Sequence, residues 1–285
     1  MSIKEYAAQT LSSRQKSFVR RYLHLFGAYE LRPAEEFVDA VVSLDGAKTF
    51  LQIGANDGYL ADPLNLAIYR HKLQGTFVEP QRYYFDRLRN TYAGFSGLTF
   101  LQCAIAENAG TMPMYSLDCS SGSLPRWAHG VGTLSYAQLL RLSDQIPDVE
   151  KYIVTDDVAC VSVAELFQRT PVANPDIIAV DAEGHDYHIL AQFDFGKLGT
   201  QVVIFETESM PAEQQNSCAA FFEQADFALV PAGQDTIAIR RTTATWKRQK
   251  QLDAEDNVTR PASASGSLGL GWQRSRRSSL EHDAG

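Results

Sequence analysis

The sequence has few cysteines and no long apolar run. Its four cysteines, Cys103, Cys119, Cys160 and Cys218, lie far apart, so no C-x-x-C pair exists for zinc binding or thiol exchange. We expect reduced thiols in a cytoplasmic protein. No apolar segment approaches the roughly 18 residues of a membrane helix, and the N-terminus lacks the apolar core of a signal peptide. The sequence therefore predicts no membrane span.

Basic residues are also under-represented. The chain of 285 residues contains 26 Lys and Arg against 34 Asp and Glu, which gives a net charge of −8 and a pI near 5.3. An acidic chain is repelled by phosphate backbones, so we expect no nucleic-acid partner. Hydrophobic residues make up 45%, which is enough for a packed core. The length favours one core with additions over two full domains.

The pattern of apolar residues divides the chain into three parts. Residues 1–48 show helical spacing, with Phe18, Tyr22 and Leu25 on one face, and Pro33 separates two N-terminal helices. Residues 49–241 alternate short apolar runs with amphipathic stretches, which is typical of a parallel sheet with crossover helices. From residue 242 to 285 the apolar rhythm is lost, and we expect a flexible, disordered tail.

Seven apolar runs in the middle part predict strands. They cover residues 49–55, 75–79, 98–105, 177–181, 201–206, 227–231 and 236–240. The last two runs are separated by only four residues, which forces an antiparallel hairpin, because a parallel crossover needs a dozen or more. The prediction is an α/β fold, a doubly wound Rossmann-like sheet with an antiparallel terminal strand.

The segment LQIGANDGYL contains the clearest ligand-binding signal. After an apolar strand it places Gly54, Ala55, Asn56, Asp57 and Gly58 in a loop that leads into a helix, an arrangement that presents backbone N–H groups to a ligand. The spacing G-x-x-x-G departs from the dinucleotide fingerprint G-x-G-x-x-G, and an acid in this loop would repel a pyrophosphate. S-adenosylmethionine has no phosphate and suits the loop. An ordinary strand-to-helix turn is the alternative.

Two later strand ends add to a nucleoside site. Glu79, followed by Pro80, ends the second strand, where a carboxylate can accept hydrogen bonds from ribose hydroxyls. Cys103 and Ala104 lie in the third strand, where small side chains suit an adenine ring. A solvated strand-end acid and ordinary core packing are the respective alternatives.

The segment AVDAEGHDYHIL carries the candidate catalytic residues Asp181, Glu183 and His185. A histidine at the start of a helix is biased toward its neutral form and can act as a general base, aided by a carboxylate. Helix capping by Asp186 with two surface acids is the alternative. The same residue types would also accept a divalent metal, so a role for a metal is left open.

Acceptor contacts are expected from two further segments. Glu206 and Glu208 follow the fifth strand and either line the acceptor pocket or are solvated. About 70 residues separate the third and fourth strands, more than one crossover helix needs, and we expect this insertion to cover the acceptor. Its Trp127 and His129 could contact a sugar, or Trp127 could anchor the loop to the core.

Taken together, these segments resemble the FkbM family of S-adenosylmethionine-dependent methyltransferases. The resemblance runs from about Phe50 to Met210 and is carried by FLQIGANDGYL, TFVEP, PDIIAVDAEGHDYHIL and VVIFETE. It implies a class I methyltransferase fold and methyl transfer to a hydroxyl, often of a sugar or natural product. By this likeness the cofactor residues would be Gly54, Asn56, Gly58 and Glu79, and the residues at the reacting end would be Asp181, Glu183 and His185.

The function expected from the sequence is thus S-adenosylmethionine-dependent O-methylation of a small acceptor, with a carbohydrate favoured. The alternative is a catalytically silent S-adenosylmethionine-binding protein that supports a partner enzyme. A nicotinamide-dependent oxidoreductase is disfavoured by Asn56, Asp57 and the terminal hairpin. The sequence makes no prediction of the oligomeric state.

Overall fold

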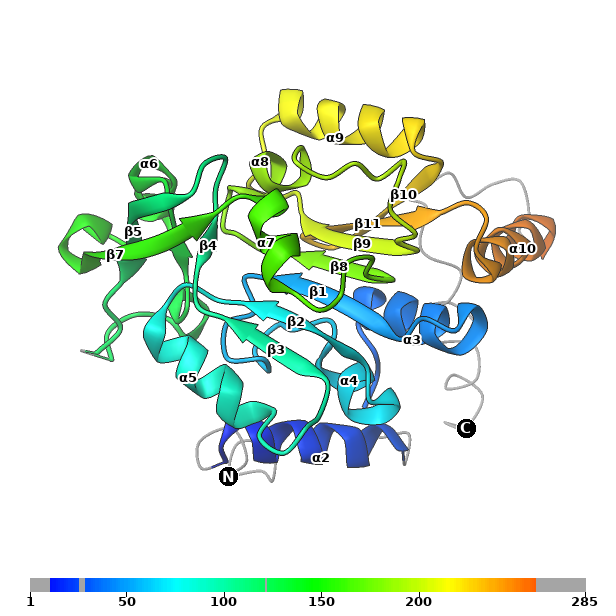
Figure 1. Ribbon diagram of the computed structural model, residues 1–285, viewed down its shortest axis with the longest axis horizontal. Helices are drawn as coiled ribbons and strands as arrows, with labels where there is room; N and C mark the ends of the chain where they lie inside the picture. The colour runs from blue at the N-terminus through cyan, green and yellow to red at the C-terminus, as the bar shows by residue number, and fades with distance from the viewer. Residues whose placement is uncertain (1–10, 26–28, 121, 260–285) are drawn as a thin grey trace.

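The computed structural model describes residues 11–25, 29–120 and 122–259 of the chain. Seven strands form one mixed sheet in the order β10-β11-β9-β8-β1-β2-β3 (Figure 1). The strands are β1 Thr49–Ile53, β2 Gln74–Val78, β3 Leu98–Leu101, β8 Ile177–Val180, β9 Val202–Glu206, β10 Phe227–Ala232 and β11 Asp235–Arg240.

Strand β1 lies inside the sheet, parallel to β2 on one side and to β8 on the other. The parallel strands continue to β3 and β9, whereas β11 runs antiparallel to both β9 and β10. The predicted doubly wound sheet with a reversed terminal strand is therefore confirmed. Because the strand order reverses between β1 and β8, a crevice is expected beyond the carboxyl ends of these two strands.

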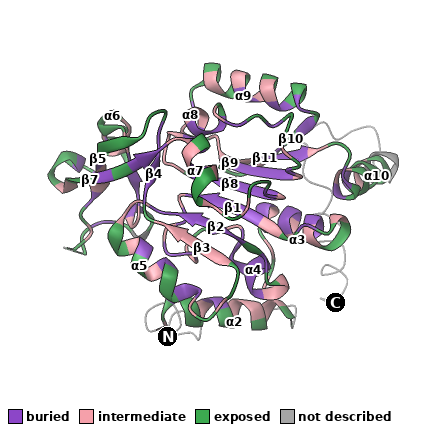
Figure 2. Cartoon of the chain, viewed as in Figure 1, coloured by how far each residue is buried: buried purple, intermediate pink, exposed green. Residues whose placement is uncertain are grey.

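Helices cover both faces of this sheet (Figure 2). One face packs against α3 Pro33–Asp45, α4 Asn65–His71 and α5 Arg82–Thr91, and the other against α7 Val163–Arg169, α8 Asp186–Leu190 and α9 Ala212–Gln224. All four residues of β8 are buried, as expected for a strand that is covered on both sides.

The N-terminal helix α2, Ser13–Leu25, is helical as predicted, but its predicted apolar face is exposed to solvent. Phe18 and Leu25 are 59% and 60% exposed, whereas Ser13 and Ser17 are buried. The cause is that α2 lies over the polar segment after β1, where the Ser13 hydroxyl donates to Asp57 (2.6 Å). Polar contacts, which the apolar periodicity does not register, thus orient this helix.

The predicted strand 98–105 is wrong as a single element. Its first half is β3, and its last two residues form β4 Ala104–Ile105 in a second sheet. That sheet has the order β4-β7-β5-β6, with β5 Gly110–Leu117, β6 Gly132–Thr133 and β7 Ile153–Val161. A continuous apolar run does not reveal that its two ends pair with different sheets. The insertion between β3 and β8 is thus a small β-unit, which also contains η1 Arg126–Ala128, α6 Tyr136–Leu140, η2 Arg141–Asp144 and η3 Val149–Tyr152.

The prediction of a disordered tail from residue 242 onward is wrong for the part of the tail that the structure describes. Residues Ala244–Thr259 form α10, in which Trp246 packs against the core. The helix begins where Asp45, at the end of α3, accepts hydrogen bonds from the Thr245 backbone N–H and hydroxyl. The low-complexity segment 260–285 lies outside the described residues. Among the described helices, none combines the length and apolarity needed to cross a membrane.

Candidate functional site

A cavity of about 900 Å³ opens beyond the carboxyl ends of β1, β2, β8 and β9. Two rims border it. The glycine-loop rim consists of Gly54, Ala55, Asn56, Glu79, Pro80 and Gln81, and the carboxylate rim of Asp181, Glu183, Glu206, Glu208 and Asp235. All these residues line the cavity, so the predicted crevice and the sequence motifs coincide.

Gly54 holds the glycine loop against the end of β8. Its φ is +77°, and a Cβ added there would lie 1.7 Å from the carbonyl oxygen of Asp181. The N–H groups of Gly54 and Ala55 both donate to the carbonyl of Val78 at 2.9 and 3.1 Å. Only glycine fits this close approach of two backbones.

Glu79 connects the two loops of this rim. Its carboxylate is 3% exposed and accepts the backbone N–H groups of Asn56 and Gln81, each at 2.8 Å. Burial raises the pKa of Glu79 to about 7, with a further contribution from Asp181, while the two N–H donors act in the opposite direction. Each oxygen keeps a lone pair with which a ligand hydroxyl can bond.

Asp57 and Gly58 do not line the cavity. The Asp57 carboxylate accepts the Ser13 hydroxyl and two backbone N–H groups of the following turn. A Cβ on Gly58 would lie 2.7 Å from Leu88 and Tyr92. The structure therefore gives these two residues a supporting position behind the loop, without direct contact with the cavity.

Cys103 and Ala104, expected beside an adenine ring, line the cavity and are 4% and 8% exposed. They lie where the chain passes from β3 in the main sheet to β4 in the second sheet. Burial raises the pKa of the Cys103 thiol to about 11, so the thiol is uncharged at neutral pH. Small, uncharged side chains of this kind are compatible with an apolar ring.

Within the described ranges, the carboxylate rim has no ion-pair partner. No Lys, Arg or His nitrogen among the described side chains lies within 4.0 Å of its five carboxylates. Burial, followed by repulsion from Glu206 and Asp235, raises the pKa of Asp181. Its carboxylate is open to the cavity, but the surrounding protein limits its hydration. The pKa of Glu206 is raised by burial first and then by Asp235 and Glu208.

The turn after β8 presents Glu183 and His185 to the cavity. Asp186 braces this turn from behind by accepting the N–H groups of Ala182 and Gly184 at about 3.3 Å. Asp186 is the first residue of α8 and does not cap it, because the N-cap is His185 without a side-chain cap; the alternative of capping by Asp186 is therefore wrong, and the three candidate catalytic residues line the cavity. Glu183 has a positive φ of 49°, a conformation that costs energy in a residue other than glycine.

His185 has the properties of a neutral imidazole. Its Nε2 is buried and has no hydrogen-bond partner among the described residues. Burial lowers the pKa of His185, and the neighbouring His188, whose ring stacks on it at 4.9 Å, lowers it further. A neutral imidazole with a free nitrogen can accept a proton.

The insertion closes one side of the cavity. Trp127 and His129 line it, and Trp127 is 44% exposed, which does not fit an anchor in the core. The loop is held close to the glycine-loop rim because the Gln81 side chain donates to the carbonyl of Gly130 (2.9 Å). Both side chains are therefore accessible to an acceptor in the cavity.

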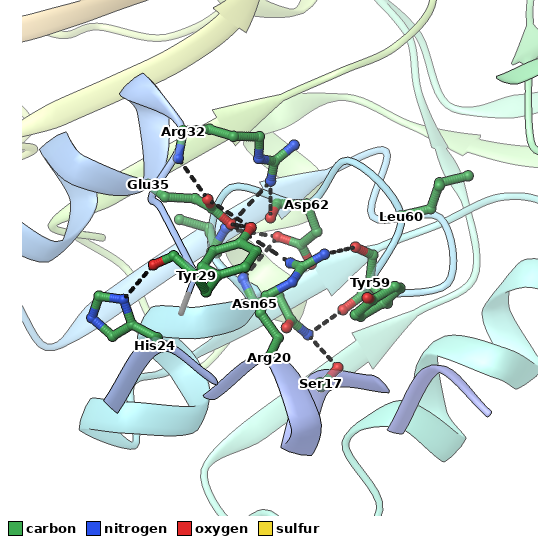
Figure 3. Close-up of polar contacts among 12 residues, drawn as sticks. Ser17, Arg20, His24, Tyr29, Arg32, Glu35, Tyr59, Leu60, Asp62 and Asn65 are labelled. Atoms are coloured by element: carbon green, nitrogen blue, oxygen red, sulfur yellow. Dashed lines mark hydrogen bonds and ion pairs between the residues drawn. The ribbon is translucent and has the colours of Figure 1, made fainter. Parts of the chain in front are cut away.

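Residues that the motifs did not indicate also line the cavity, and Figure 3 shows the polar contacts of two of them, Arg32 and Asp62. Arg32, just before α3, donates to the carbonyl of Asp62 (2.7 Å) and pairs with Glu35 (3.2 Å). Arg32 and Asp62 both line the cavity, and so does Gln52 of β1. The only sequence signal for these residues was the polar Gln52 inside an apolar strand.

No group of three or more His, Cys, Asp or Glu side chains within the described ranges is arranged to hold a metal ion.

The chain is similar to one protein family and to several solved structures. Residues 52–235 match the family model of the methyltransferase FkbM domain. No curated protein matches the chain. A solved FkbM methyltransferase from Methylobacillus flagellatus KT is similar in structure, with 13% identity and a TM-score of 0.46 over 80% of this chain. The chain spans only 58% of that protein's length.

Two further solved structures are similar at lower scores. A putative caffeoyl-CoA O-methyltransferase from Staphylococcus aureus is 11% identical, with a TM-score of 0.39 over 84% of this chain and 97% of the other. Aeropyrum pernix fibrillarin, solved with S-adenosyl-L-methionine, is 8% identical, with a TM-score of 0.36 over 72% and 73%. Since the family model covers well over half of the chain, this protein belongs to the FkbM family of S-adenosylmethionine-dependent methyltransferases.

Proposed function

We propose that this protein transfers a methyl group from S-adenosylmethionine to a hydroxyl of a small acceptor, with a sugar or glycan as the acceptor class. The observation that supports this proposal best is the single cavity that Glu79, Asp181 and a neutral His185 share at the switch point of the sheet. A nucleoside-binding acid and a proton acceptor on one cavity are what such a transfer requires.

The cavity fits the cofactor. Its volume of about 900 Å³ lies within the roughly 300–1,000 Å³ of typical ligand pockets. Glu79 would accept the ribose hydroxyls, and Cys103 and Ala104 would contact the adenine. The backbone of Gly54 to Asn56 would face the amino-acid end, and Asp181 would lie near the positively charged sulfur.

His185 would act as the general base. When bound, S-adenosylmethionine would supply an electrophilic methyl group, whose bond to sulfur would be replaced by a bond to the acceptor oxygen while the electron pair stays on sulfur. The hydroxyl proton would pass to the imidazole of His185 and then to solvent, a role worth roughly 10²- to 10⁴-fold in rate. Asp181 or Glu183 would stabilise the imidazolium that forms.

The walls of the cavity would align the acceptor. Trp127 offers an aromatic face for a sugar ring, and His129 and Glu206 offer hydrogen bonds to its hydroxyls. Holding the acceptor oxygen in line with the carbon–sulfur bond can contribute about 7–11 kcal/mol of the barrier.

We also propose a reducing, cytoplasmic location. All four cysteines are free thiols, and three of them are buried. This usage is typical of proteins that are kept reduced.

Two measurements test the function. Calorimetry should detect binding of S-adenosylmethionine and S-adenosylhomocysteine but not of NAD. A screen of sugar acceptors should release S-adenosylhomocysteine. Binding without release for any acceptor would favour the silent, partner-supporting alternative, and binding of NAD alone would contradict the proposed function.

A further inference from the structure

The N-terminal part of the chain adds a cationic side chain to the wall of the cavity. Arg32 lies immediately before α3 and lines the cavity, although it falls outside the segment 52–235 that matches the family model. Its guanidinium is anchored at one nitrogen, because Nη2 donates to the carbonyl oxygen of Asp62 (2.7 Å) and to the carboxylate of Glu35 (3.2 Å). The protein itself therefore holds this side chain in place.

The rest of this guanidinium is available to a ligand. Figure 3 shows Nη2 turned toward Asp62 and Glu35. The other two nitrogens, Nε and Nη1, carry three N–H donors, and neither has a hydrogen-bond or ion-pair partner among the described residues. The side chain of Arg32 is 43% exposed, whereas that of Glu35 is 1% exposed. Arg32 thus offers unused donors and a positive charge at the cavity wall.

The acids around Arg32 do not reach these donors. Glu35 is shared between two guanidinium groups, because a nitrogen of Arg20 lies 3.6 Å from its carboxylate. The carboxylate of Asp62 accepts two backbone N–H groups of the following turn. Asp62 and Asp235 act on Arg32 only through space. An anionic group of a ligand would satisfy donors that the described acids leave free.

Arg32 lies on the side of the cavity where the amino-acid end of the cofactor is expected. The proposed function places the adenine after β3 and the ribose on Glu79 after β2, and the next strands in the sheet are β1 and β8. The carbonyl that orients Arg32 belongs to Asp62, in the segment that follows β1, and Asp235 begins β11, beyond β8 and β9. A cofactor that extends along the strand ends from β3 toward β8 therefore directs its amino-acid end toward Arg32.

That end of S-adenosylmethionine carries both an ammonium group and a carboxylate. The carboxylate rim can accept hydrogen bonds from the ammonium group, but it repels the cofactor's own carboxylate. The cofactor carboxylate therefore needs donors from another part of the wall. Among side chains, a guanidinium has the donor geometry that best matches a carboxylate.

The backbone of the glycine loop does not supply these donors. The N–H groups of Gly54 and Ala55 donate to the carbonyl of Val78, and that of Asn56 donates to Glu79. The next two N–H groups of the loop are bound within the loop, to the Asn56 side chain and to the carbonyl of Ala55. All five N–H groups from residue 54 to residue 58 therefore have partners in the protein itself.

A second arginine lines the cavity at a different place. Arg141, at the start of η2, is the only other Lys or Arg among the described residues of the lining. It belongs to the insertion, and Gln138, three residues earlier, packs on the turn after β8, since a Cβ on Gly184 would lie 2.7 Å from its amide. Arg141 is thus placed near the reacting end, on the side of the acceptor.

We propose that Arg32 binds the carboxylate of the methionyl group of S-adenosylmethionine through the donors on Nε and Nη1, so that the N-terminal region completes the cofactor site. This inference rests on the proposed function and adds a cofactor-binding residue from outside the matched domain. Glu35 and the backbone of Asp62 have a positioning role, because they hold the guanidinium at Nη2.

The test compares S-adenosylmethionine with decarboxylated S-adenosylmethionine, which keeps the nucleoside, the sulfonium and the amine but lacks the carboxylate. Calorimetry on the full-length protein measures both affinities. We expect the parent to bind S-adenosylmethionine roughly 10- to 100-fold more tightly than the decarboxylated form. Arg32→Met should lose this factor for S-adenosylmethionine alone, so that the two ligands bind about equally. Where Arg32→Met does not fold, Arg32→Gln, whose amide can still donate to the Asp62 carbonyl, should show the same loss.

Two matched variants separate contact with the cofactor from an effect on the fold. Arg20→Met removes the other guanidinium that pairs with Glu35 and does not line the cavity. Arg141→Met removes the other arginine of the cavity wall. Both variants should keep the parental preference for the carboxylated ligand. Because the preference is a ratio of two affinities, an unfolded fraction of a variant does not change it.

The outcomes distinguish this inference from the function on which it rests. Equal binding of both ligands by the parent, or the parental preference in Arg32→Met, would show that Arg32 does not bind the carboxylate. Loss of the preference in Arg141→Met alone would overturn the inference in favour of the insertion. In these cases S-adenosylmethionine still binds and the proposed function stands, whereas a parent that binds neither ligand would remove both.

Discussion

At the glycine-loop rim the Glu79 carboxylate accepts N–H groups from Asn56 and Gln81, whereas at the carboxylate rim Glu206 and Asp235 face each other without a cation within 4.0 Å. Both rims border one cavity and both are acidic. The first has its polar groups satisfied by the protein's own backbone. The second leaves acceptors to be satisfied by whatever binds there.

This difference suggests how the two rims divide their tasks. A rim braced by its own hydrogen bonds is preorganised, so a ligand binds there at little cost in ordering. A rim of unpaired carboxylates is destabilising in the free protein, a cost that functional sites commonly carry. We infer that the first rim holds the cofactor and that the second rim faces the acceptor.

The largest expected effect is at His185, between the rims. His185→Ala should lower kcat by roughly 10²- to 10⁴-fold and leave the affinity for S-adenosylmethionine nearly unchanged, because only proton transfer is lost. His71→Ala, whose side chain pairs with Asp39 away from the cavity, should retain kcat within a few-fold. Product release assays measure both, and parental turnover in His185→Ala would show that another group is the base.

The next effect tests the rigidity of the glycine-loop rim. Gly58→Ala places a methyl 2.7 Å from Leu88 and Tyr92 at a φ of +69°, which should cost about 1–3 kcal/mol for overpacking in addition to roughly 1–2 kcal/mol for the backbone. Gly46→Ala, at φ +72° in open space, isolates the backbone cost. Denaturant unfolding compares the two, and equal losses would mean that packing behind the loop is not tight.

A smaller effect is expected for cofactor binding at the same rim. Glu79→Ala removes the proposed ribose contact and should weaken S-adenosylmethionine binding by about 1.5–3 kcal/mol, or roughly 10- to 150-fold. The matched control is Glu107→Ala, an exposed acid that does not line the cavity. Calorimetry measures the affinity of both variants for S-adenosylmethionine. An unchanged affinity in Glu79→Ala would remove this residue from the cofactor site.

The smallest effect tests the carboxylate rim in the free protein. Burial raises the folded-state pKa of Glu206 and Asp235, so the unfolded chain ionises first and the free energy of unfolding falls as the pH rises from about 4 toward neutrality. Glu206→Gln with Asp235→Asn should remove this loss.

We therefore expect the double variant to match the parent near pH 4 and to exceed it by about 0.5–1 kcal/mol near pH 8. This corresponds to a gain in Tm of roughly 1–4 °C. A variant that is less stable than the parent at pH 8 would show that the two carboxylates have partners in the free protein, and the comparison between the rims would fail.

The part of the site that could be predicted from the sequence is the part formed within short segments. Gly54, Glu79 and Asp181 each lie directly after an apolar run, and the carboxyl ends of parallel strands meet at one edge of a sheet. The supporting position of Asp57 was not foreseen, because its partner Ser13 lies 44 residues away.

What the sequence by itself determined about this protein is the set of strands in the main sheet, its reversed terminal strand and the loops that border the cavity, since periodicity and turn chemistry act locally. Tertiary structure alone decided that β4 belongs to the second sheet and that α10 begins at Asp45, 200 residues earlier in the chain. It also decided that Gln52, Arg32 and Asp235 line one cavity. Such contacts depend on which distant segments pair, and that choice follows from the packing of the whole core and is encoded in no single stretch of the chain.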